Sequence, residues 1–232
     1  MRRVFRFGFA ADLVGNSSSA KDLEGPYGSR ELAYLQQEFS SEWKGGEGES
    51  WASALQWNPE RRVFQAVLVR PDRAFDLAVA LTEAFWPASC RTALVAGSGF
   101  SQPGPAEQAL ELLTAHAGGP GSFTCDLPGR SPQENELVEI VAKLHNTLMS
   151  EWTPTRWKAV RAYRRLGRQR AVAEDLGVTQ QAVSQMLRGA RLRELQKAED
   201  CFRRWLQGKG RPGIWPLPGE RRSSTFAETL LP

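Results

Sequence analysis

The sequence predicts an α+β protein in which a mixed front part precedes an all-helical rear part. Apolar residues follow alternately the repeat of a strand and the repeat of a helix up to about residue 150, and from Trp152 to Leu206 the repeat is helical. Charge divides in the same way: residues 1–150 contain 13 Lys or Arg and 18 Asp or Glu, whereas residues 151–232 contain 17 and 8. At 232 residues the chain can form two small domains, and we expect an α/β domain over 1–150, a helical domain over 151–207 and a Gly/Pro-rich tail over 208–232.

The front part begins with a predicted strand. In "RRVFRFGF" the residues Val4, Arg6 and Gly8 alternate with phenylalanines, which is the pattern of a strand. A Gly/Ser-rich loop follows, and apolar residues three or four apart then predict a helix from Arg30 to about Trp43. Next, the turn signal "NPE" separates two short strands, near "WASALQW" and "RRVFQAVLV", which we interpret as a hairpin.

A second helix and strand complete a recognisable order of elements. Pro71 and Asp72 are helix-start residues at the head of "PDRAFDLAVALTEAFW", and "RTALVAGSGF" returns to the pattern of a strand. The resulting order, β-α-β-β-α-β, is that of a ferredoxin-like fold. A helix over Ala106–Ala117, a strand in "SFTCDL" and an amphipathic helix from about Gln133 to Met149 extend it.

The stretch "RQRAVAEDLGVTQQAVSQMLRG", from Arg168 to Gly189, has the pattern of two short helices joined by a tight turn. Ala173 is small enough to let two helices cross closely, Gly177 tolerates a positive φ in the turn, and Thr179 can cap the second helix. The combination predicts a helix-turn-helix. Its expected buried face consists of Val172, Leu176, Val178, Val183 and Met186.

The outward side of the second helix predicts contacts with the bases of double-stranded DNA, because Gln amides suit adenine and Arg suits guanine in the major groove. The candidate base-reading residues are Thr179, Gln180, Gln181, Ser184, Gln185 and Arg188. Cations that flank the two helices are expected at DNA phosphates, namely Arg164, Arg165, Arg168, Arg170, Arg191 and Arg193. The alternatives are a polar, solvated helix in a helical hairpin and a module that contacts only protein.

Two family resemblances rest on longer stretches. The segment "WTPTRWKAVRAYRRLGRQRAVAEDLGVTQQAVSQML" resembles the tetrahelical helix-turn-helix of sigma-factor region 4. The segments "FAADLVGNS" and "FQAVLVRPDRAFDLAVALTEAFWPASCRTALVAGSGF" resemble the bacterial SatD family, whose members join a front domain to such a helix-turn-helix. The SatD front domain is similar to the palm-like core of class III nucleotidyl cyclases, where one Asp at the end of the first strand and another in the central hairpin hold a metal ion.

This resemblance places Asp12 at the first acidic position. At the second position the family has a "GDEFQ"-like stretch, whereas this chain has "RRVFQ", with Arg61, Arg62 and Val63 in place of the glycine and the acids. An arginine repels the cations that phosphate chemistry needs, so we expect no catalytic residues and no cyclase activity. Asp12 is either part of a degenerate nucleotide or metal site or a loop-start residue that bonds its own backbone amides.

The remaining composition argues against several other classes. Cys90, Cys125 and Cys201 are far apart and form no CxxC pattern, which indicates a reducing cytoplasm and neither a disulfide framework nor a thiolate metal site. His116 and His145 stand alone, so no metal and no cofactor is expected. No apolar run reaches the roughly 18 residues that a membrane span needs.

These observations favour a cytoplasmic bacterial transcriptional regulator whose front domain senses a small-molecule or protein effector, or dimerises. The alternatives are a nucleotide-binding or cyclase-like enzyme that its helix-turn-helix targets to DNA, and an adaptor that binds protein with both modules. A homodimer is expected because one reading helix covers only a few base pairs. One side of the helix from Arg191 to Leu206 either contributes to the dimer contact or packs back on its own helix-turn-helix; it carries Leu192, Leu195, Phe202 and Leu206.

Overall fold

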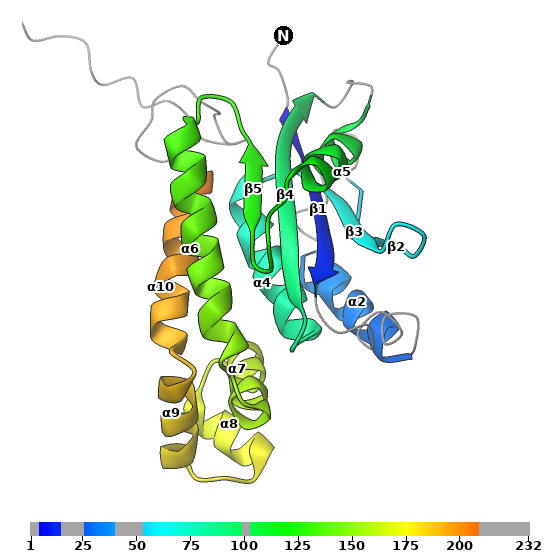
Figure 1. Cartoon of the computed structure of the whole chain (residues 1–232). Helices are drawn as coiled ribbons and strands as arrows, with labels where there is room; N and C mark the ends of the chain where they lie inside the picture. The colour runs from blue at the N-terminus through cyan, green and yellow to red at the C-terminus, as the bar shows by residue number, and fades with distance from the viewer. Residues whose placement is uncertain (1–4, 15–25, 40–52, 99–102, 209–232) are drawn as a thin grey trace, which may run out of the picture.

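A five-stranded sheet forms the centre of the front part of the molecule (Figure 1). The computed structural model describes residues 5–14, 26–39, 53–98 and 103–208. In sheet order the strands are β2 (Gln56–Asn58), β3 (Val63–Leu68), β1 (Phe5–Val14), β4 (Ser89–Ser98) and β5 (Phe123–Asp126). Strand β1 is antiparallel to both β3 and β4, β2 is antiparallel to β3, and β4 pairs with β5 in parallel. The sheet is therefore mixed, and the described chain is an α+β structure.

Helices make up most of the rest of the described chain. Those of the front part are α2 (Pro26–Glu38), the short 3-10 helix η1 (Pro71–Arg73), α4 (Ala74–Ala84), α5 (Pro105–Ala115) and α6 (Pro132–Ser150). Those of the rear part are α7 (Pro154–Leu166), α8 (Gln169–Leu176), α9 (Gln180–Gly189) and α10 (Leu192–Leu206). Helix α2 begins four residues before the predicted Arg30, and the predicted end at Trp43 lies outside the described residues.

Side-chain caps fix the starts of the helices that lead to the rear part. The Ser131 hydroxyl accepts a hydrogen bond from the Glu134 amide and the Thr153 hydroxyl accepts one from the Arg156 amide, each satisfying a donor that the first turn of a helix leaves free. A proline in the first turn of α6 and of α7 already has the φ of a helix. The predicted boundary at residue 150 thus falls between two well-capped helices.

Both faces of the central strand β1 are covered, although its sequence alternates like a strand with one polar face. Arg6, Phe7 and Gly8 are all buried. Helix α5 crosses so close to β1 that a Cβ atom at Gly8 would lie 1.7 Å from the carbonyl oxygen of Pro105. Glycine is therefore required at this crossing. Although polar and apolar residues alternate along the start of β1, both faces of the strand are covered there.

The rear helices fold back onto the sheet domain and share its core. Helix α10 runs beside α6 and packs on α4 and η1, and the ring of Phe202 stacks on Phe75 with a centroid distance of 3.7 Å. One continuous set of buried apolar residues connects strand β1 with α9 and α10. The apolar side of α10 is buried within its own chain, so of the two roles expected for it the dimer contact is wrong. It packs on α9, as the second role requires, and also on η1, α4 and α6. This side carries Leu192, Leu195, Phe202 and Leu206.

Two of the three cysteines lie inside this core. Cys90 and Cys125 are buried free thiols, and burial raises the pKa of each to about 12. Cys201 is a free thiol on the exposed side of α10. Among the described helices, none has the length and apolar character that crossing a bilayer requires.

Candidate nucleic-acid interface

Helices α8 and α9 are joined by a three-residue turn that Gly177 makes possible. Gly177 has φ 65° and ψ 35°, a left-handed conformation that glycine adopts without strain. The amides of Gly177 and Val178 donate to the carbonyls of Glu174 and Ala173 at 3.4 and 3.0 Å, which closes the end of α8 in a Schellman pattern. Thr179 then caps α9, because its hydroxyl accepts a hydrogen bond from the Ala182 amide at 3.1 Å. The local geometry is the one expected from the sequence.

The small core between the two helices contains most of the predicted residues. Val172 and Val183 are fully buried, whereas Leu176 and Met186 are half-buried and pack against the same core. Val178 is 41% exposed, so its place in the predicted buried face is wrong. The reason is that it follows the left-handed glycine in the turn, where helical spacing no longer governs the direction of the side chain.

The outward side of α9 is accessible to solvent along its length. The residues exposed there are Thr179, Gln180, Gln181, Gln185 and Arg188. Ser184 is half-buried and lines a polar groove between α7, α9 and α10 together with Arg188 and Arg193. Within the described residues, the side chains of Gln181 and Gln185 have no hydrogen-bond partner, and they lie one helical turn apart on the same face. This face can offer paired amide donors and acceptors to a ligand.

The predicted phosphate-contacting cations differ in their surroundings. Arg168, Arg191 and Arg193 are exposed and have no carboxylate partner in the described part of the chain. Arg165 and Arg170 are exposed but each lies near a carboxylate, at 2.9 Å from Asp175 and 3.2 Å from Glu174. Exposed ion pairs of this kind contribute little free energy, so both guanidiniums remain available to an external anion such as a phosphate.

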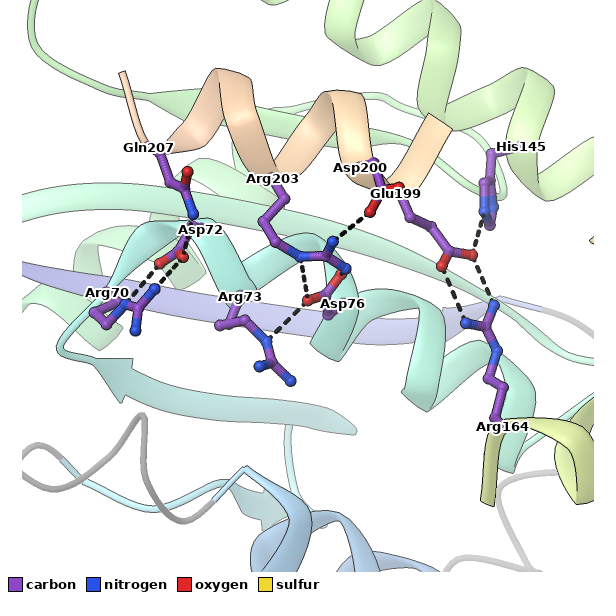
Figure 2. A network of polar contacts seen from close by, with 10 residues as sticks. All are labelled: Arg70, Asp72, Arg73, Asp76, His145, Arg164, Glu199, Asp200, Arg203 and Gln207. Atoms are coloured by element: carbon purple, nitrogen blue, oxygen red, sulfur yellow. Dashed lines mark hydrogen bonds and ion pairs between the residues drawn. The ribbon is translucent and has the colours of Figure 1, made fainter. Parts of the chain in front are cut away.

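Arg164 does not belong to this set, which corrects the prediction for it. Its guanidinium lies 2.6 Å from Glu83 of α4 and 2.7 Å from Glu199 of α10. Figure 2 shows the second of these contacts, with His145 on the other side of Glu199. Both carboxylates are buried, and the second also bonds His145 of α6 at 3.1 Å. Although its side chain is 28% exposed, the Arg164 guanidinium is thus neutralised by two buried carboxylates of its own chain and is not a free cation for a DNA phosphate.

The acidic partners of Arg164 respond differently to this arrangement. Burial raises the pKa of Glu83, and the attraction of Arg164 only partly offsets that rise. Burial would also raise the pKa of Glu199, but hydrogen bonds from His145 and Arg164 outweigh burial and lower it to about 2. Glu199 is therefore ionised at any pH near neutrality and holds three helices together.

Further polar contacts continue this connection along α10 (Figure 2). Arg203 bonds Asp76 at 3.0 Å, and the Gln207 amide donates to Asp72 at 2.9 Å. We name this set of contacts the seam; it joins α7 and α10 of the rear part to η1 and α4 of the front part through Asp72, Asp76, Glu83, Arg164, Glu199, Arg203 and Gln207. Two cations of the rear part, Arg164 and Arg203, are thus neutralised by acids of the same chain, and their presence requires no ligand.

One cation near α9 was missing from the sequence prediction. A Cβ atom at Gly189 would lie 2.9 Å from Nε of Arg156, so this guanidinium lies against the C-terminal end of α9. Arg156 belongs to the first turn of α7, twelve residues before Arg168, and no local pattern connects it with the second helix of the pair. Its position in the resembling segment "WTPTRW" is the only sequence signal that could have found it.

The surroundings of Asp12 rule out one of its two sequence interpretations and leave the degenerate nucleotide or metal site as a prediction. Strand β1 continues to Val14, so Asp12 lies within a strand and the loop-start interpretation is wrong. Its two carboxylate oxygens accept hydrogen bonds from Arg91 of β4, one of them at 3.0 Å. On the other side its neighbour in the sheet register is Val63, while Arg62 lies in the hairpin turn with φ 54°. A cation at Asp12 would have to compete with the Arg91 guanidinium.

The two histidines have carboxylate neighbours in the structure. His145 is buried against Glu199, and His116 lies 3.2 Å from Glu139. No group of three or more His, Cys, Asp or Glu that could hold a metal ion occurs among the described residues.

Comparisons with models of protein families, with curated proteins and with solved structures find no match to this chain. The site must therefore be interpreted from its own chemistry.

Proposed function

We propose that this protein is a cytoplasmic, sequence-specific DNA-binding protein that regulates transcription. In this proposal α8 and α9 are a helix-turn-helix, and α9 enters the major groove of double-stranded DNA. The observation that carries the proposal is the exposed face of α9, where Gln181, Gln185 and Arg188 lie over a helix pair closed by Gly177 and Thr179. Their surroundings leave these side chains free to bond an external partner.

The chemistry of that face suits base edges. A glutamine amide can donate to N7 and accept from the N6 amino group of one adenine at the same time, and arginine can donate to O6 and N7 of guanine. Gln181 and Gln185 are one turn apart, so they would meet neighbouring base pairs along the groove. Arg188 follows on the same side near the end of the helix.

Exposed cations around α9 would fix the helix on the DNA backbone. Arg168 lies at the start of α8, and Arg191 and Arg193 lie at the start of α10, so that cations stand at both ends of the reading pair. Arg156 adds a fourth cation beside Gly189. Phosphate contacts of this type set position and most of the salt dependence, whereas the base contacts set sequence preference.

The front domain supports the reader in this proposal and does no chemistry. Its strand order β2-β3-β1-β4, with α2 and α4 as the connecting helices, supports a ferredoxin-like arrangement to which β5 is added. The Asp12–Arg91 pair supports a non-catalytic role, because it neutralises the carboxylate that the SatD and cyclase resemblance assigns to a metal. The domain would instead sense a small-molecule or protein effector, or hold two copies together.

The proposal can be tested with the full-length chain and DNA. We expect genomic fragments selected by the protein to share a short sequence, and a duplex with that sequence to bind at least about 1,000-fold more tightly than a scrambled duplex at physiological salt. Fluorescence anisotropy at several salt concentrations measures both affinities. Equal affinity for the two duplexes would remove the sequence-specific function, and no binding to either would favour the adaptor.

A separate measurement addresses the enzyme alternative. Incubation of the protein with ATP or GTP and either Mg²⁺ or Mn²⁺ is expected to give no cyclic product, because Arg91 and Val63 occupy the surroundings of Asp12. Product formation above background that disappears in Asp12→Ala would instead support a cyclase-like enzyme that its helix-turn-helix targets to DNA.

A further inference from the structure

Helix α6 has an apolar stripe on its outer side that nothing in the described chain covers. Leu137 is 63% exposed and Leu144 is 61% exposed, and between them Ile140 and Val141 are 47% and 37% exposed. The spacing of three, one and three residues places all four on one face of the helix. Elsewhere in the described chain, the exposed large apolar residues are only Tyr34 and Val178, each on a different element. The stripe is thus a concentrated patch.

Different charges flank the two long edges of this stripe. Counting about 100° per residue around α6, Glu136 and Lys143 lie on one side of the stripe, and His145, which contacts α10, lies on the other. Glu136 is exposed and has no basic partner among the described residues, whereas Lys143 already pairs with Glu139 at 2.6 Å. The first edge therefore carries a net negative charge.

The second edge is formed by α10, where two exposed cations and one exposed acid, Glu194, leave a net positive charge. Lys197, Cys201 and Arg204 are exposed on α10, and Arg204 bends over Cys201, with its Nη2 atom 3.1 Å from the sulfur. Cys201 lies one turn before Trp205, whose ring packs against the Arg130 guanidinium just ahead of α6 at 4.3 Å, so this side of α10 is the one turned toward α6. In the described chain neither Lys197 nor Arg204 has a carboxylate partner.

We infer that the stripe is the contact between two copies of this chain, in which the two α6 helices pack side by side and run in the same direction. A twofold axis parallel to α6 sets the acidic edge of each copy against the basic edge of the other, so that Glu136 meets Arg204 of the second copy. An axis perpendicular to α6 would instead set each edge against itself. The charges on the two edges therefore favour the parallel pair.

The parallel pair also deepens the proposed function, and only this consequence rests on it. Helix α6 leads through Trp152 into α7, and the reading helices lie at the C-terminal end of α6 (Figure 1). Two parallel copies would present both α9 helices at the same end of the dimer, as binding to two half-sites on one face of DNA requires. An antiparallel pair would place the readers at opposite ends.

The mass of the protein in solution without DNA tests the contact independently of DNA binding. By light scattering we expect a dimer of the 25.8 kDa chain for the natural protein and a monomer for the double variant Leu137→Glu, Leu144→Glu. Four facing carboxylates in the dimer should raise its dissociation constant at least about 100-fold. Tyr34→Glu is the control for an added surface charge, because it places one carboxylate per chain at an exposed aromatic residue of α2 and should leave the dimer intact.

Cysteine cross-linking in a Cys201→Ser background determines the direction of the helices. In the parallel pair Leu137 faces Leu137 of the second copy, so Leu137→Cys alone and Leu144→Cys alone should each form an intermolecular disulfide under mild oxidation. In an antiparallel pair only a mixture of the two variants would do so, and that result would overturn the proposed arrangement. Circular dichroism of each variant checks folding, which should persist because both positions face solvent.

An exchange of charges tests the two edges. Glu136→Arg and Arg204→Glu should each weaken the dimer about 2- to 5-fold, and the two changes together should restore it. The inference fails if the natural protein is monomeric at 100 micromolar or so, or if the glutamate variants dimerise as well as the natural protein. It also fails if removal of residues 209–232 converts a monomer into a dimer, since the tail would then be what covers the stripe. None of these outcomes depends on whether the protein binds DNA.

Discussion

Arginines have opposite roles at the seam and around α9, although both regions belong to the same basic half of the chain. At the seam, Arg164 and Arg203 bond carboxylates that are wholly or largely shielded from solvent, at distances of 2.6–3.2 Å. Around α9, Arg168, Arg191 and Arg193 are exposed and have no described carboxylate partner. Net charge alone therefore does not locate a binding surface. What distinguishes the regions is whether the fold brings acids from distant segments to the same place.

The largest expected difference between the two regions is in stability. Arg164→Ala should lower the free energy of unfolding by about 3–5 kcal/mol, because it leaves Glu83 and Glu199 buried without their shared cation. Arg168→Ala should change it by less than about 0.5 kcal/mol, as is usual for an exposed side chain. Urea unfolding of both variants measures this contrast. Similar losses for the two variants would mean that the seam does not hold the rear part in place.

A pH titration tests the contribution of Glu199, an acidic residue of the seam, to stability. Because the pKa of Glu199 is lowered from 4.5 to about 2 in the folded chain, its ionised form contributes stability that is complete above pH 4.5 and is lost as the pH falls toward 2. Glu199→Gln should therefore cost about 3 kcal/mol at pH 7, and progressively less below pH 4.5. Urea unfolding between pH 7 and pH 3 measures the gap between the variant and the natural protein. A gap that stays constant over this range would contradict the assignment.

The smallest expected difference is in the salt dependence of DNA binding. Arg168→Ala should reduce the slope of log affinity against log salt by about 1, because one phosphate contact is lost. Arg203→Ala removes the same charge at the seam and should leave that slope unchanged, since its guanidinium pairs with Asp76. Anisotropy titrations from low to high salt compare the two. Equal reductions would show that the slope reports only the total charge of the chain.

Local pattern was sufficient to predict the elements that are fixed by near neighbours. The turn at Gly177 and the cap at Thr179 involve residues within five positions of each other, and both occur as predicted. The order of strands and helices also follows from the spacing of apolar residues, which changes clearly between the repeat of a strand and the repeat of a helix. Val178 was misplaced because the pattern was extended across a turn in which the helical repeat is interrupted.

Distant partners could not be predicted in this way. Arg164 bonds Glu83, which precedes it by 81 residues, and nothing near either residue in the sequence indicates the other. For α6 a signal was present, because its apolar residues include the exposed Leu137 and Leu144 as well as the buried Val138 and Ala142. An apolar arc of that width exceeds one buried face and indicates a second partner. The sequence of α6 therefore indicates the stripe, but it does not indicate that α10 lies beside it.

The most direct test of the central claim, that α9 reads DNA sequence, compares binding to the selected duplex and to a scrambled duplex. Gln181→Ala and Gln185→Ala should each cost about 1–3 kcal/mol on the selected duplex and little on the scrambled one, because each removes hydrogen bonds to base edges. Gln37→Ala is the matched control, since Gln37 is exposed on α2 and should leave both affinities unchanged. If the Gln181 and Gln185 variants lose affinity for both duplexes equally, or for neither, α9 is not the helix that reads the sequence.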